Sequence, residues 1–154
     1  MITSDDTMIK NIGVWIDHKE AFLVFVEGVH TKIERIESNA EGHFRPSGGW
    51  KASGTNVAQS VLKEQKADSR RMQQYAKYYK EVIKKAGNLS NLYIFGPGEA
   101  KLELKKEIEK MKGQHARIVT IEASDWLTEN QIASKAKSFL ARFLVSYRIE
   151  RNRL

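Results

Sequence analysis

Two short runs near the start of the chain carry apolar side chains on nearly every residue. They cover Asn11 to Ile16 and Ala21 to Val26. Strands that are apolar on both faces belong in the middle of a sheet that is covered on both sides. A third run, Val29 to Glu37, alternates roughly between apolar and polar residues after the turn signal Glu27-Gly28. The sequence therefore predicts an antiparallel three-stranded meander whose first two strands lie centrally.

From Asp68 onward the apolar residues recur with the period of a helix. The stripe expected to face the core consists of Met72, Tyr75, Ala76, Tyr79, Ile83 and Ala86. Gly87 follows as a helix C-cap. A last helix is expected from Thr128, where Thr128 and Gln131 can form a capping box. The buried stripe predicted for that helix is Ile132, Ala136, Phe139, Leu140, Phe143 and Tyr147.

Strands and helices alternate in the second half of the chain. The predicted order there is a strand at Leu92 to Phe95, a helix to about Lys112, and a strand at Ala116 to Glu122 before the last helix. Strands that alternate with helices run parallel to one another. The whole order, β-β-β-α-β-α-β-α, predicts an α/β, ribonuclease H-like fold with a mixed five-stranded sheet and helices on both faces.

The chain reads as one domain of residues 11–154 behind a disordered or extended segment, residues 1–10. Between Ser38 and Gln65 it is rich in Gly, Ser and Asn and shows no sustained period. We expect a long basic loop at 38–66, and loops of this length in compact domains tend to be functional or disordered. Val57, Val61 and Leu62 suggest that the end of this segment is already helical.

The positive charge of the chain is concentrated rather than spread evenly. The net charge is +7, and the segment from Glu41 to Ala86 alone holds ten bases and four acids. Such clustering is typical of proteins that bind polyanions, although a lysine-rich surface can also serve solubility alone. The chain has no cysteine and no apolar run of the ~20 residues that a membrane span needs, and two early acids argue against a secretory signal. We expect a cytoplasmic protein with no membrane partner.

Three segments resemble the middle domain of eukaryotic and archaeal release factors and of Pelota-like rescue factors. They are Gly13 to Ala21, Ile94 to Leu104 and Asp125 to Ile132, and they also resemble small bacterial relatives labelled translational machinery proteins. The resemblance spans about Asn11 to Phe143. It implies a ribosome- or RNA-associated translation factor, with the ribosome or a structured RNA as partner and with no cofactor. The sequence does not indicate an oligomeric state.

In release factors the loop after the third strand carries a Gly-Gly-Gln motif whose glutamine positions water, and here Gly48-Gly49-Trp50 stands in that loop. An indole donates one hydrogen bond and cannot orient water as an amide does, so the resemblance implies a factor without this catalysis. Trp50 can instead stack on a base, or fold back over the sheet edge. The residues predicted to contact RNA are Gly48, Gly49, Trp50, Lys51, Lys63, Lys66, Arg70, Arg71 and Lys77.

A hydrolase is the alternative function, either a peptidyl-tRNA hydrolase with an altered motif or a metal-dependent nuclease. Asp17 ends the first strand, where ribonuclease H-like nucleases hold a metal-binding carboxylate, and Glu122 and Asp125 could complete a two-metal site. The competing interpretation is that the Asp17 side chain shapes the strand turn. The Gly96-Pro97-Gly98 segment is expected to be a tight strand-to-helix turn, and the four histidines lack metal-ligand spacing.

Overall fold

The computed structural model describes residues 9–40, 54–113 and 115–152. The strands of this part are β1 (Lys10–Ile16), β2 (Glu20–Glu27), β3 (His30–Glu37), β4 (Ser90–Gly96) and β5 (Arg117–Ala123). The helices are α1 (Gly54–Ala86), α2 (Ala100–Glu109) and α3 (Glu129–Asn152). This order of elements confirms the predicted β-β-β-α-β-α-β-α succession. None of the helices described is long and apolar enough to cross a lipid bilayer.

All five strands form one mixed sheet in the order β3-β2-β1-β4-β5. β1, β2 and β3 are antiparallel neighbours, while β1, β4 and β5 run parallel. β1 is the central strand, and its residues Ile12 to Ile16 are all buried. The predicted α/β class and five-stranded mixed sheet are confirmed, and the ribonuclease H-like assignment stays a prediction.

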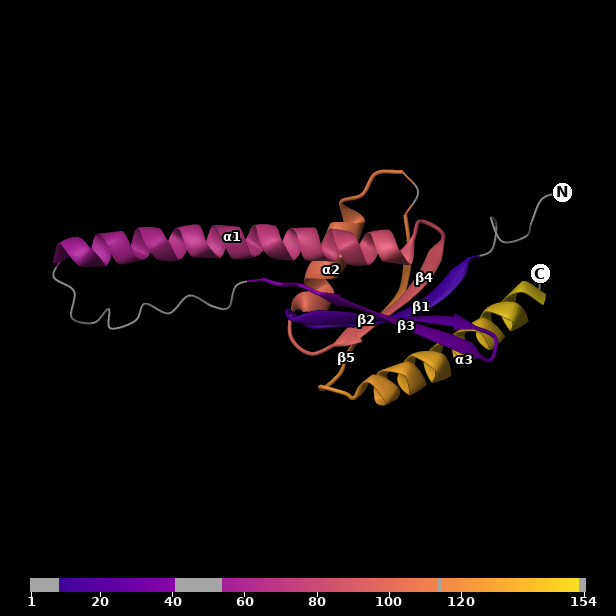
Figure 1. The fold of residues 1–154 in the computed structure, drawn as a ribbon. Coiled ribbons are helices and arrows are strands. Elements are labelled where there is room, and N and C mark those ends of the chain that lie inside the picture. The colour runs from indigo at the N-terminus through magenta and orange to yellow at the C-terminus, as the bar shows by residue number, and fades with distance from the viewer. Residues whose placement is uncertain (1–8, 41–53, 114, 153–154) are drawn as a thin grey trace.

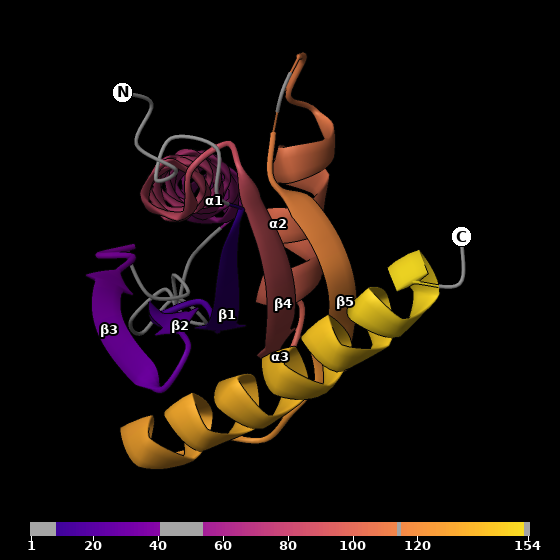
Figure 2. The same cartoon turned by 90° about the vertical axis from the view of Figure 1, so that its right-hand side faces the viewer.

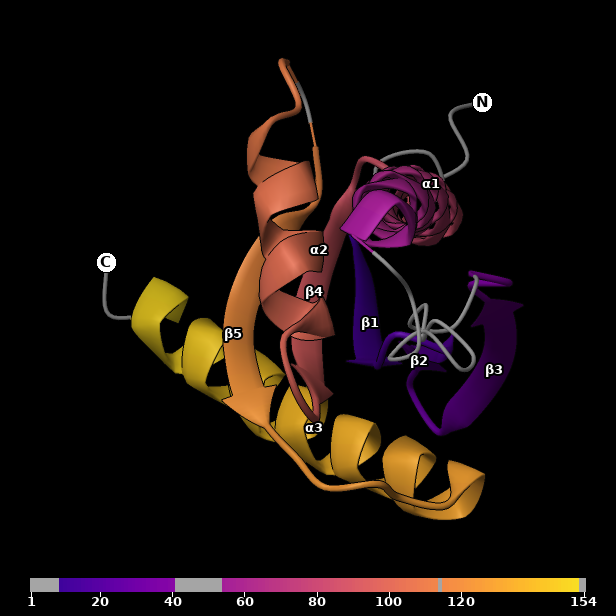
Figure 3. The same cartoon turned by 90° about the vertical axis from the view of Figure 1, so that its left-hand side faces the viewer.

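Helices cover both faces of this sheet, as predicted. Figures 2 and 3 show α1 and α2 on one face and α3 running across the other. Because side chains alternate along a strand, Ile12, Val14 and Ile16 pack under α1 and α2. Trp15, together with residues of β2 and β4, packs under α3. The sheet thus separates two hydrophobic cores, each closed by its own helix layer.

α1 differs from its prediction in length and in the face that it buries. It begins at Gly54, so residues 54–66 of the predicted loop are helical, and half of the long helix extends past the sheet (Figure 1). Met72, predicted to be buried, is 71% exposed. It lies in the part of α1 before Tyr78, where none of the described side chains is buried. Tyr78 and Val82, absent from the predicted stripe, are almost fully buried, and Tyr79, Ile83 and Ala86 are buried as predicted.

α3 starts as the sequence predicts. The Gln131 side chain accepts from the Thr128 backbone N–H at 2.9 Å, and the Gln131 N–H donates to the Thr128 hydroxyl at 3.2 Å. This reciprocal capping box fixes where the helix begins. Ile132, Ala136 and Leu140 are fully buried. The side chain of Tyr147, the last residue of the predicted stripe, lies outside the described residues.

The closest approach of α3 to the sheet depends on a glycine in β1. A Cβ atom on Gly13 would lie 2.4 Å from the Cβ of Ala136. We therefore expect Gly13→Ala to lower the free energy of unfolding by about 1–3 kcal/mol through overpacking. Adding Ala136→Gly removes the clash, and the double variant should recover all but the ~1 kcal/mol that a helical glycine costs. Urea denaturation of the four proteins of this cycle measures the coupling, and strictly additive effects would contradict the contact.

Candidate nucleic-acid interface

One straight row of basic residues runs along the solvent-facing side of α1. Residues spaced by three and four return to the same side of a helix, and this spacing links Lys63, Lys66, Arg70, Gln73, Lys77, Lys80 and Lys84. We call this set the basic stripe. All seven side chains are exposed. At ~1.5 Å per residue the stripe is about 32 Å long, and six of its seven members are cations.

The acids of α1 lie mostly on its other sides. Its carboxylates are Glu64, Asp68 and Glu81. Helical spacing puts Glu64 and Asp68 away from the basic stripe, and Glu81 borders it. Within the described part of the chain, no carboxylate comes within ion-pair distance of the five stripe lysines; Lys85, outside the stripe, does pair with Glu34 at 3.5 Å. Among the described residues, the five lysines of the stripe therefore carry positive charge that no ion pair offsets.

Arg71, one of the residues predicted to bind RNA, is not part of the stripe. Its guanidinium lies 2.5 Å from the Asp68 carboxylate, one helical turn earlier, and its side chain is only 18% exposed. This ion pair and partial burial distinguish Arg71 from the exposed cations of the stripe, and its contact with RNA stays a prediction. Lys63, Lys66, Arg70 and Lys77 lie together in the stripe, and their contact with RNA stays a prediction. Gly48, Gly49, Trp50 and Lys51 lie outside the described residues.

Lys80 and Lys84 belong to the stripe although they were not among the predicted contacts. The signal that finds them is the regular alternation of three- and four-residue steps from Lys63 onward. That signal has meaning only once the whole segment is known to be helical, because the same spacing in a strand or loop aligns nothing.

Two tyrosine hydroxyls hold α1 at a fixed rotation over the sheet. Tyr78 donates to the backbone carbonyl of Asp17 at 3.0 Å, and Tyr79 donates to the Glu103 carboxylate of α2 at 3.0 Å. Glu103 also binds His18 at 2.7 Å, so β1, α1 and α2 meet at one cluster. Because these tyrosines are on the side opposite to the basic stripe, their contacts turn the stripe toward solvent.

Burial, and then the negative charge of Asp17, raises the pKa of Tyr78 well above its usual value. Burial, and then the Glu103 carboxylate, raises the pKa of Tyr79 in the same way. In the unfolded chain a tyrosine ionises near pH ~10. The stabilising contribution of these tyrosines is therefore complete below pH ~10 and is lost as the pH rises from there toward their folded-state pKa values.

We accordingly expect the free energy of unfolding to fall steeply between about pH 9.5 and 12, as the unfolded state loses tyrosine protons first. In Tyr78→Phe the fall should be shallower, while stability at pH 8 should be lower by about 1 kcal/mol for the lost hydrogen bond. Urea denaturation at several pH values measures both effects, since lysine ionisation is common to the two proteins. Identical alkaline slopes would show that Tyr78 ionises freely in the folded state.

Asp17, the proposed metal ligand of the nuclease alternative, uses its carboxylate to build the turn between β1 and β2. Its Oδ1 accepts from the backbone N–H groups of Lys19 and Glu20, both at 2.8 Å, and its Oδ2 accepts from the Trp126 indole at 3.2 Å. The side chain is 9% exposed. This is the turn-shaping role that the sequence offered as the competing interpretation.

The other two acids of the hypothetical metal site do not join Asp17 in a ligand cluster. The Glu122 carboxylate accepts from the Tyr93 hydroxyl and lies 3.8 Å from Lys135, on the α3 side of the sheet. Asp125 is exposed, and its backbone carbonyl accepts from the Trp15 indole. In the described residues no three His, Cys, Asp or Glu side chains gather as metal ligands would. The geometry does not bring the predicted carboxylates together.

The stability of Asp17 variants should follow the number of hydrogen-bond acceptors that the new side chain retains. Asp17→Ala leaves two backbone N–H groups and an indole without their partner and should cost about 1–3 kcal/mol of stability. Asp17→Asn retains one oxygen for the two N–H groups and should cost less. Thermal denaturation of the three proteins checks this order. Wild-type stability of Asp17→Ala would mean that the carboxylate serves some purpose other than the turn.

No protein-family model matches the chain, and no curated protein matches it either. Among solved structures, the crystal structure of the archaeal translation termination factor aRF1 is similar, with a TM-score of 0.40 and 11% sequence identity. The similarity covers 92% of this chain but only 42% of that protein. Of the release-factor resemblance, the comparisons thus show a distant structural similarity and nothing more. A likeness of this size leaves the function to be argued from the chain's own residues.

Proposed function

We propose that this protein is a non-catalytic RNA-binding factor of the translation machinery that contacts RNA phosphates through the basic stripe of α1. The observation that carries the proposal is the stripe itself, six cations in one row on an exposed helix face. A nucleic acid backbone is the partner whose chemistry matches a long row of like charges, because it repeats one negative charge per nucleotide. The motifs that resemble release factors favour ribosomal or other structured RNA.

The stripe works against the stability of its own helix. Like charges three or four residues apart destabilise a helix by roughly 0.2–0.5 kcal/mol per pair. Lys63 with Lys66, Lys66 with Arg70, and Lys80 with its neighbours Lys77 and Lys84 are such pairs. Together they cost about 1–2 kcal/mol by the same measure. Surface charge kept only for solubility would have no reason to gather where it repels itself, whereas a phosphate partner turns the repulsion into attraction.

The rigidity of α1 suits this contact. A continuous helix of 33 residues holds the cations at constant spacing, and its outer half stands clear of the sheet (Figure 1). Cations arranged in advance lose less conformational freedom when they bind. Such contacts position a protein on RNA without reading its sequence. The contribution of Gly48-Gly49-Trp50 and Lys51 to the same interface stays a prediction.

A hydrolase is not favoured by any observation on the described residues. The Asp17 carboxylate already accepts three hydrogen bonds from its own chain. The loop that would carry an altered peptidyl-tRNA hydrolase motif lies outside the described residues. Binding therefore remains the function with a structural basis.

The salt dependence of RNA binding tests the proposal. In log–log form the affinity for single-stranded RNA should fall with salt at a slope of about −0.7 per phosphate contacted. Replacing Lys77, Lys80 and Lys84 with glutamine removes three contacts, so the slope should become shallower by about 2. Glutamine has nearly the helix propensity of lysine, and removing the repulsion should leave the melting temperature unchanged or raise it. Fluorescence anisotropy of a labelled, single-stranded fragment of ribosomal RNA measures the slope.

The matched control is the triple change of Lys105, Lys106 and Lys110 to glutamine on α2. It removes the same charge, but Lys105 and Lys110 are already paired, with Glu109 at 3.7 Å and with Glu107 at 3.1 Å. Its slope should stay within error of the wild type. Equal losses in the two triple variants would show that only net charge matters and would overturn the stripe as the interface.

A further inference from the structure

A row of three polar side chains crosses the sheet face that α3 otherwise covers with apolar contacts. Asn11 of β1 is the register partner of Asn91 of β4, which in turn is the partner of Arg117 of β5. Register partners in neighbouring parallel strands point to the same face of a sheet. Two residues further along β1 and β4 stand Gly13, packed against α3, and the buried Tyr93. The polar row therefore marks the edge of the α3 core.

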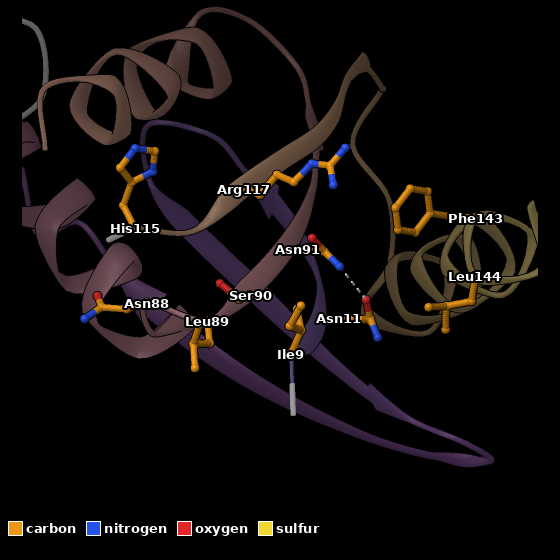
Figure 4. A pocket seen from close by; sticks show the side chains of 10 residues that line it. All are labelled: Ile9, Asn11, Asn88, Leu89, Ser90, Asn91, His115, Arg117, Phe143 and Leu144. Atoms are coloured by element: carbon orange, nitrogen blue, oxygen red, sulfur yellow. Dashed lines mark hydrogen bonds between the residues drawn. The ribbon is translucent and has the colours of Figure 1, made fainter. Parts of the chain in front are cut away.

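A pocket of about 270 Å³ opens over this row. Figure 4 shows the three polar side chains on the strands and Phe143 and Leu144 of α3 on the other side. None of the residues that line it is acidic, and Arg117 supplies its positive charge. Pockets for drug-sized ligands begin near ~300 Å³, so this one suits a ligand of about the size of one nucleobase with its sugar.

The single hydrogen bond between the two amides leaves one amide nitrogen and one amide oxygen without a protein partner among the described residues. The Asn91 Nδ2 donates to the Asn11 Oδ1 at 3.2 Å. Within the described residues no partner is present for the Asn11 Nδ2 or the Asn91 Oδ1. If both side-chain amides are flipped by 180°, the atoms without a protein partner are again one nitrogen and one oxygen. Adjacent donors and acceptors of this kind are what the edge of a nucleobase presents, and asparagine is a common partner of such edges.

The pocket lies where the basic stripe ends. Asn88 and Leu89 line its rim and follow directly on the last turn of α1. Lys84, the last cation of the stripe, is four residues before Asn88. A nucleic acid strand that follows the stripe past the C-terminal end of α1 reaches this turn and has to pass around the amino ends of the strands to enter the pocket on the α3 face.

We propose that this pocket binds one unpaired nucleotide, with the base edge on the Asn11 and Asn91 amides and the phosphate on Arg117. The inference rests on the proposed function in that the nucleotide belongs to the same RNA that lies on the stripe. The half-buried Phe143 ring supplies an aromatic wall against which a base can stack. A guanidinium is the side chain best shaped to hold a phosphate through two hydrogen bonds.

The test is a calorimetric titration of the full chain with AMP, beside adenosine and ribose 5-phosphate. AMP should bind more tightly than either fragment, because the amides need the base and Arg117 needs the phosphate. Arg117→Gln should weaken AMP binding at least about tenfold and leave adenosine binding unchanged. Arg142→Gln is the matched control, an exposed arginine of α3 that does not line the pocket, and it should bind AMP as the wild type does.

Asn11→Leu separates binding from a structural role. A leucine beside Leu144 should leave the melting temperature unchanged or raise it, because an amide maintained for a ligand works against packing. AMP binding should nevertheless fall at least about tenfold, since two of the base contacts depend on this amide. A destabilised Asn11→Leu that binds AMP normally would show that the amide pair is structural and would overturn the proposal.

Competition distinguishes the two sources of a nucleotide. A short oligoadenylate should displace AMP if the pocket takes a nucleotide of RNA. AMP binding without displacement would support a site for free nucleotides and overturn the placement of RNA there.

No AMP binding, with the stripe variants still altering RNA affinity, would overturn the pocket alone. AMP binding without any effect of the stripe variants would overturn the proposed function alone. A short peptide amide that binds in place of AMP would overturn the nucleotide assignment.

Discussion

The contact of Tyr78 and Tyr79 with the sheet and α2 is the interaction on which the candidate interface depends. Each ring is buried, and each hydroxyl donates to an acceptor at the carboxyl end of β1 or the start of α2. A helix turns by about 100° for each residue. If the residues next to Tyr78 and Tyr79 were buried in their place, α1 would be rotated by about this angle, and the basic stripe would face the sheet edge. The hydrogen bonds and the packing together decide that the cations face solvent.

The two ends of the parallel strands contrast in how their polar groups are satisfied. At the carboxyl end, the Asp17 carboxylate binds two backbone N–H groups and the Trp126 indole. Those groups serve the fold, and Trp126 is held in place although it is 72% exposed. At the amino end, the Asn11 and Asn91 amides satisfy each other only in part. An amide pair with polar atoms open to a pocket is a better indication of a ligand than a carboxylate whose bonds are complete.

The pattern-based predictions succeeded where one local rule dominates. The continuous apolar runs predicted the buried strands, and the capping box predicted the start of α3. α1 begins at Gly54, earlier than the helical period from Asp68 predicted, although Val57, Val61 and Leu62 had suggested that the end of the Gly- and Ser-rich segment is helical. Arg71 was predicted to contact RNA from its charge, and the structure pairs it with Asp68 three residues earlier; its contact with RNA stays a prediction.

The sequence by itself determined the kinds of element, their order and the concentration of positive charge in one segment, because these depend on period and composition within a short window. The tertiary structure alone decided which distant residues meet. Asn11 and Asn91 are 80 residues apart and become neighbours because β1 and β4 pair in parallel. Likewise, the lysines of α1 become one exposed row because burial of the tyrosines sets the rotation of the helix. Register and rotation are set by packing between elements, and no local pattern contains that information.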